Sequence, residues 1–149
     1  MQKSDGVKCA DAALLAARIL IALLFLIFGW SKLFGYSGTV QYMAHVGAPL
    51  PALAALVAIV MEVFVGIAIV LGLATRPLAL LLAVYTFGAA LIGHHFWSMS
   101  GMDRYMNEIN FYKNVSIIGG LLALYVAGAG RYSFDSWWCG RKSGAPAGG

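Results

Sequence analysis

One acidic side chain, Glu62, lies within a long apolar part of the sequence. No charged residue occurs from 33 to 61, and a charge held in the middle of a membrane costs roughly 3 kcal/mol or more. By helix register, Lys32 and Arg18 lie on either side of Glu62 along the bundle, so we expect neither to reach it. We therefore expect Glu62 to be largely protonated, or to share a proton with Asn114 or a nearby hydroxyl, and to be the catalytic residue of a proton transfer. The alternative is a structural hydrogen bond between helices.

A second group of polar side chains could bind a ligand in the outer half of the molecule. His94 and His95 end one apolar stretch, and Lys113 and Asn114 begin the next. Cationic and amide donors of this kind can hydrogen-bond a quinone carbonyl or hold a small anion. The alternative is an ordinary membrane interface, with lysines that extend to the head groups and hydrated histidines. The candidate ligand-binding residues are Arg18, Lys32, His94, His95, Lys113 and Asn114.

The elements that position these residues follow from composition. With 61% hydrophobic and 11% charged residues, the chain is too apolar for a soluble globular domain of 149 residues. A nucleic-acid partner is not expected, because no stretch of the sequence supplies a clustered basic face. Four apolar stretches have the length of about 20 residues that crosses a bilayer as a helix. We predict an all-α membrane protein, a bundle of four transmembrane helices. The expected spans are about 12–34, 51–74, 77–97 and 111–129, in a single domain of residues 1–135 with a flexible tail of 136–149.

The connections set the topology of this bundle. We expect two longer loops, Gly35 to Leu50 and Ser98 to Asn110, on the face opposite the termini. Seven Lys and Arg residues fall on the terminal face and three on the other. Because cytoplasmic loops carry the excess of basic residues, both termini and the tail of this multi-pass protein are predicted to be cytoplasmic.

Small residues at helical spacing indicate where the helices approach closely. Gly29 shares a stripe with Lys32 on the first span, and Gly66 follows Glu62 by four residues on the second. Gly120 has the same role on the fourth span. These glycines are the predicted packing positions, although stripes of this kind could also form a homo-oligomer.

The sequence is poor in cofactor ligands. Adjacent His94 and His95 point in different directions on a helix, which does not suit a bis-histidine haem. Cys9 and Cys139 form no Cys-x-x-Cys motif, so a dithiol centre is not expected. We expect no covalently bound cofactor, favour a quinone as the ligand and disfavour copper. The weaker metal alternative is a Cu(I) site formed by His94, His95, Met99, Met102 and Met106.

Three segments together resemble a known family. They are RILIALLFLIFGWSKL at 18–33, EVFVGIAIVLGLATR at 62–76 and FYKNVSIIGGLLAL at 111–124, the last followed by GAGRYSFD at 128–135. In order and spacing they resemble the DoxX family of small bacterial inner-membrane proteins, over about Leu15 to Asp135. The resemblance implies a four-helix, multi-pass protein of the bacterial inner membrane. Some members of the family are linked to thiosulfate:quinone oxidoreduction or to redox complexes of oxidative-stress defence. The matching positions are Arg18, Gly29, Lys32, Glu62, Gly66, Lys113, Asn114 and Gly120.

The function that we expect is that of a quinone-associated integral subunit of a membrane redox complex. The chain has no nucleotide-binding, zincin or nucleophile-elbow motif, so we do not expect it to be catalytic alone, and protein partners would supply the electron donor. A scaffold or assembly partner is the first alternative, and it predicts a solid apolar bundle. A small-solute or copper handler is the second, and it predicts a wet path past Glu62.

Overall fold

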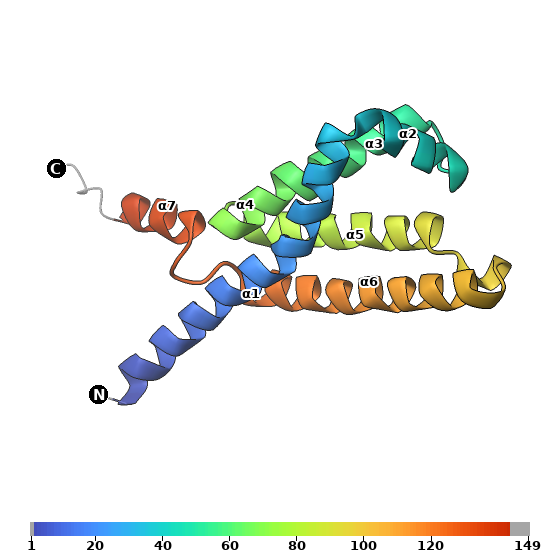
Figure 1. Ribbon diagram of the computed structural model, residues 1–149. Helices are drawn as coiled ribbons and strands as arrows, with labels where there is room; N and C mark the ends of the chain where they lie inside the picture. Colours follow the sequence, from blue (N-terminus) through green and yellow to red (C-terminus); the bar gives the residue numbers. More distant parts are fainter. Residues whose placement is uncertain (1, 144–149) are drawn as a thin grey trace.

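The computed structural model describes the backbone of residues 2–143 and the side chains of residues 7–139. This part of the chain is helical and contains no strand (Figure 1). Four of its helical segments are long and apolar enough to cross a membrane, which confirms the predicted all-α membrane architecture. These segments are Val7–Phe34, Pro51–Leu71, Thr75–Ser98 and Gly101–Ala127.

The helices follow one another with short breaks. The first span belongs to α1 (Gln2–Phe34), and a short helix, α2 (Tyr36–His45), follows it. The second span is made of three consecutive pieces: α3 (Pro51–Ile59), the π-helix η1 (Val60–Val65) and α4 (Gly66–Leu71). The remaining elements are α5 (Thr75–Gly93), the 3₁₀ turn η2 (Phe96–Ser98), α6 (Gly101–Ala127) and α7 (Phe134–Ser143).

The two expected loops are largely helical, which corrects the sequence prediction. Residues 36–45 form α2, and α6 begins at Gly101 rather than at residue 111. The prediction was wrong because it took charged residues to mark the end of a helix, whereas they mark only where a chain leaves the hydrocarbon. Asp103 lies in the first turn of α6, where a negative charge favours the start of a helix.

Part of the expected tail is helical. Its residues 136–143 belong to α7, which begins at Phe134, and residues 144–149 lie outside the described part of the chain. At the other end of the sequence, α1 begins at Gln2, well before the expected first span. Both helices extend the bundle beyond its apolar segments.

The four spans pack as two pairs that share a small core. α1 packs against all three pieces of the second span, and α5 packs along α6 (Figure 1). The two pairs lie close at the α4–α5 turn and diverge toward the end that carries α2 and η2 (Figure 1). Large apolar side chains outside the core are exposed on every span, as lipid contact requires. The buried core includes Ala22, Phe25, Met61, Ile69, Leu82, Leu121 and Leu124.

Polar contacts close the end of the bundle where the pairs meet. The fully buried Arg18 guanidinium donates to the carbonyl oxygens of Val70, at 3.2 Å, and of Tyr132. The carboxylate of Asp135 accepts the backbone N–H groups of Ala74 and Thr75, at 2.7 and 2.9 Å, and so caps the start of α5. The start of α1 and α7 therefore lie at the same end as the α4–α5 turn (Figure 1).

Candidate functional site

A cavity of about 700 Å³ lies between the diverging helix pairs. Its walls come from α1, α2, the second span, α5 and α6, and most of the side chains that line it are apolar. Two groups of polar residues interrupt this lining. The first group is Lys32, Glu62 and Tyr85, and the second is His94, Asn110, Lys113 and Asn114.

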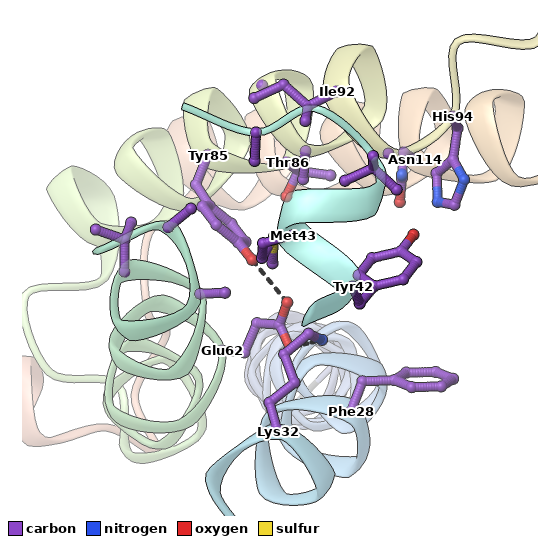
Figure 2. A pocket seen from close by; sticks show the side chains of 18 of the residues that line it. Phe28, Lys32, Tyr42, Met43, Glu62, Tyr85, Thr86, Ile92, His94 and Asn114 are labelled. Atoms are coloured by element: carbon purple, nitrogen blue, oxygen red, sulfur yellow. Dashed lines mark hydrogen bonds and ion pairs between the residues drawn. The ribbon is translucent and has the colours of Figure 1, made fainter. Parts of the chain in front are cut away.

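Glu62 is the centre of the first group, and both of its carboxylate oxygens have partners (Figure 2). Lys32 Nζ lies 2.6 Å from Glu62 Oε2, and the hydroxyl of Tyr85 donates to Glu62 Oε1 at 2.6 Å. Glu62 is only 7% exposed. A carboxylate on the second span thus joins an ammonium on α1 to a phenol on α5, so three spans meet at one acid.

The expectation that no cation reaches Glu62 is therefore wrong. The helix register placed Lys32 too far along the bundle, because register alone does not give the relative height of two packed helices. In the structure Glu62 packs directly against Gly29, where an added Cβ would come within 2.7 Å of Glu62 Cβ. Lys32 follows Gly29 by less than one turn, so its long side chain spans the remaining distance. Glu62 therefore has the cationic partner that the sequence reasoning did not expect.

The π-helix η1 accounts for the local placement of Glu62. In an α-helix, consecutive residues point about 100° apart, so three in a row seldom face the interior together. Within η1, Met61, Glu62 and Val63 are all buried. The wider turn of a π-helix, which is frequent at functional sites, allows this and brings the carboxylate to the cavity wall.

The second polar group belongs to α6 and the end of α5. Its members His94 and Asn114 lie apart from Glu62 (Figure 2). His94 Nδ1 is 2.9 Å from Asn107 Oδ1, which orients the ring. Lys113 Nζ donates to Asn110 Oδ1 at 2.7 Å. The Asn114 amide lines the cavity and has no hydrogen-bond partner among the described residues. This wall therefore presents amide and ammonium donors to an apolar space.

Two of the predicted ligand-binding residues do not line the cavity. Arg18 lies at the opposite end of the bundle, bound to backbone carbonyls. His95 is also outside the lining, and its Nδ1 lies 2.9 Å from the carbonyl oxygen of Ile92. The alternative copper ligands Met99, Met102 and Met106 do not line the cavity either. In the described part of the chain, no three His, Cys, Asp or Glu residues form a group that could hold a metal ion.

Tyr85 lines the site and was missed by the sequence reasoning. A tyrosine in an apolar stretch usually only fills space, and Tyr85 is distinguished only by its contact with Glu62. Asn110, which precedes Lys113 by three residues and so shares its helix face, was expected beside Lys113 at the start of the fourth span and lines the cavity. The expectation that a nearby hydroxyl contacts Glu62 pointed to Tyr85 without identifying it.

The three predicted packing glycines all lie at contacts between α1 and another span. A Cβ on Gly66 would come within 3.1 Å of Leu26, and one on Gly120 within 3.4 Å of Ile21. Gly29, on α1 itself, has the closest approach of the three, to Glu62. Small residues let α1 approach both its neighbours, as is common in membrane bundles.

Comparison with known proteins agrees with this architecture. The sequence profile of the DoxX family matches residues 13–95, more than half of the chain. The chain belongs to the DoxX family. It is 57% identical to the inner membrane protein YphA of Escherichia coli K12 over 122 residues, which cover 82% of this chain and 87% of YphA. It is 40% identical to the inner membrane protein YqjF of the same organism over 131 residues, which cover 86% of this chain and 93% of YqjF.

A more distant relative carries a functional name. The chain is 32% identical over 84 residues to a protein of Bacillus subtilis 168 named "Putative oxidoreductase CatD", covering 56% of this chain and 61% of that protein. No solved structure matches the chain significantly. With its four apolar spans and its close relatives in the E. coli inner membrane, this DoxX protein is a multi-pass inner-membrane protein.

Proposed function

We propose that the cavity binds the head group of a membrane quinone, and that the protein is a quinone-binding integral subunit of a redox complex. The observation that carries this proposal is an apolar cavity of about 700 Å³ on which a few hydrogen-bond donors converge from three spans. Sites for small lipophilic ligands have this character, with a volume of about 300 to 1,000 Å³ and few polar groups. A quinone head group matches it, because its ring is apolar and its two carbonyl oxygens accept hydrogen bonds.

The donors on α5 and α6 are suited to those oxygens. Lys113 and Asn114 lie on one face of α6, and His94 lines the cavity from the end of α5. A bound quinone accepts electrons, so negative charge develops on its oxygens, and fixed ammonium and N–H groups stabilise that charge. Lys32, which was expected to donate directly, is committed to Glu62 at 2.6 Å.

The Glu62 group is suited to proton exchange beside the ligand. Lys32 and Tyr85 each offer a proton to a different oxygen of the carboxylate. We propose that Glu62 exchanges a proton with the bound ligand. The hydroxyl of Tyr85 links the carboxylate to α5. General acid–base catalysis requires such a carboxylate to lie within hydrogen-bond reach of the ligand, directly or through one water, and Glu62 lines the cavity in which the ligand would bind.

We propose that a partner subunit carries the electron donor for the bound quinone. The oxidoreductase name of the Bacillus subtilis relative supports a redox assignment. The cavity also favours ligand binding over a purely scaffolding role, for which a solidly packed bundle would be expected.

Thermal unfolding of the purified protein in nanodiscs, titrated with a short-chain ubiquinone and with menadione, tests the proposal. A ligand that binds the folded state raises stability by about 2.7 kcal/mol at a hundred times its dissociation constant. We expect such a rise in the wild type, and a smaller one in Asn114→Leu, which removes a donor from the lining. The matched control is Ser116→Ala on the same helix, since Ser116 does not line the cavity.

Native purification and mass spectrometry give a second test. We expect a quinone and at least one redox subunit to co-purify with the protein. A protein that carries neither, and whose unfolding temperature responds to no quinone, would contradict the proposal.

A further inference from the structure

The side chains that line the cavity carry more positive than negative charge. Lys32 is neutralised by Glu62, at 2.6 Å. Lys113 has only the neutral amide oxygen of Asn110 as a partner, at 2.7 Å. The Lys32–Glu62 contact is the only ion pair in the part of the chain whose side chains are described. The lining therefore keeps one unmatched positive charge, on the ammonium of Lys113.

No other group near the cavity removes this excess. The remaining ionisable residues of the lining are Tyr42, Tyr85 and His94, and protonation of the histidine would add to the positive charge. Asp103 and Glu108, also on α6, lie outside the lining and form no ion pair with any residue whose side chain is described. The carboxylates of Asp11 and Asp135 bind backbone N–H groups at the opposite end of the bundle.

The ammonium of Lys113 is accessible to a ligand. Lys113 is an exposed residue of α6 that borders a mostly apolar cavity. An anion bound there would place its charge on the ammonium and its apolar part against the lining. Only one of the three N–H donors of the ammonium is used, in the bond to Asn110. Two donors and the full charge therefore remain for a ligand.

We propose that the preferred ligand of the cavity is a lipophilic organic anion of the quinone class, with an ionised ring oxygen on Lys113 and its ring against the apolar lining. This rests on the proposed quinone site and narrows it to one charge state. Asn110, Lys113 and Asn114 follow an i, i+3, i+4 spacing and so share one face of α6. The unpartnered amide of Asn114 adds an N–H donor for the same oxygen.

Two matched probes separate charge from shape. 2-Hydroxy-1,4-naphthoquinone loses its acidic proton and is an anion at pH 8, whereas 2-methoxy-1,4-naphthoquinone has nearly the same shape and stays neutral. Binding to the protein in nanodiscs of neutral lipid can be measured for both by quenching of tryptophan fluorescence. We expect the anion to bind the wild type at least about tenfold more tightly, because charge-assisted hydrogen bonds are roughly twice as strong as neutral ones.

Variants assign the preference to one side chain. Lys113→Gln should bind both probes about equally, and Lys113→Arg should keep the preference for the anion. The control Lys8→Gln removes an exposed lysine of α1 that does not line the cavity, and it should bind as the wild type does. The comparison of the two probes on the wild type does not depend on any variant being folded.

Each outcome has a distinct meaning. Equal binding of the two probes to the wild type overturns this inference and leaves the proposed quinone site intact. A preference that persists in Lys113→Gln overturns the assignment to Lys113, whose ammonium would then simply extend to the membrane surface. Binding of neither probe counts against the proposed function itself, and the inference fails with it.

Discussion

The ion pair between Glu62 and Lys32 gives the sharpest prediction for mutagenesis. Glu62→Gln keeps the size of the side chain but removes its charge. The amide oxygen can still accept the hydrogen bond from Tyr85, whereas the Lys32 ammonium loses its carboxylate. We expect a folded but less stable protein, because a cation remains in the bundle without a counter-charge.

The exposure of the two side chains sets the expected size of the effect. Removing one partner of a fully buried ion pair costs about 3 to 5 kcal/mol. Here the Lys32 side chain keeps 23% of its exposure and that of Glu62 keeps 10%. The unpaired ammonium of Lys32 can therefore shift toward solvent or head groups, which lowers the cost. We expect Glu62→Gln to lose about 2 to 3 kcal/mol of unfolding free energy.

A double-mutant cycle measures the pair itself. Lys32→Met should cost a similar amount, because it leaves the Glu62 carboxylate with only the phenol of Tyr85. The double variant Lys32→Met/Glu62→Gln removes both charges, so it should be less destabilised than the sum of the single variants by about 1.5 kcal/mol or more. Unfolding in mixed micelles of increasing dodecyl sulfate content, followed by circular dichroism, gives the four free energies. Glu108→Gln is the control, since Glu108 forms no ion pair.

Additive effects, within about 0.5 kcal/mol, would refute the ion pair as a stabilising contact. The proposed role of Glu62 in proton exchange has its own test, which compares Glu62→Gln with Glu62→Ala. If Glu62→Gln keeps stability and ligand-dependent activity while Glu62→Ala loses both, Glu62 only holds helices together. If Glu62→Gln folds and binds ligand but loses activity, its role in proton exchange is supported.

Three further predictions concern packing, capping and topology. Gly29→Ala should destabilise the protein by about 1 to 3 kcal/mol in the same unfolding assay, because its Cβ would come within 2.7 Å of Glu62 Cβ; a variant as stable as the wild type would show that α1 can move away. Asp135→Ala should cost about 1 kcal/mol, since two backbone N–H groups at the start of α5 lose their acceptor, and unchanged hydrogen exchange there would contradict this cap. With cytoplasmic termini, a membrane-impermeant maleimide added to whole cells should label Gln41→Cys and not Cys9; the opposite pattern would reverse the orientation.

The sequence by itself determined the class of this protein and most of its architecture. The number of spans follows from local runs of apolar residues, because the length needed to cross a bilayer is the same wherever the helix packs. The cost of polar groups in hydrocarbon also identified Glu62, Lys113 and Asn114, all of which line the cavity. The ends of helices were less predictable, since Asp103 and its charged neighbours can leave the membrane and remain in α6.

Only the tertiary structure decided which polar groups meet. Lys32 and Glu62 are 30 residues apart in sequence, and Tyr85 lies a further 23 along the chain, so their contact depends on how three helices cross. Helical spacing gives the face on which a residue lies, but not the relative height of two helices. The relative height of α1 and the second span is set at Gly29, where the two helices approach closely. This contact brings Glu62 beside Lys32. For the same reason, Arg18 binds backbone carbonyls at the far end of the bundle and not the cavity.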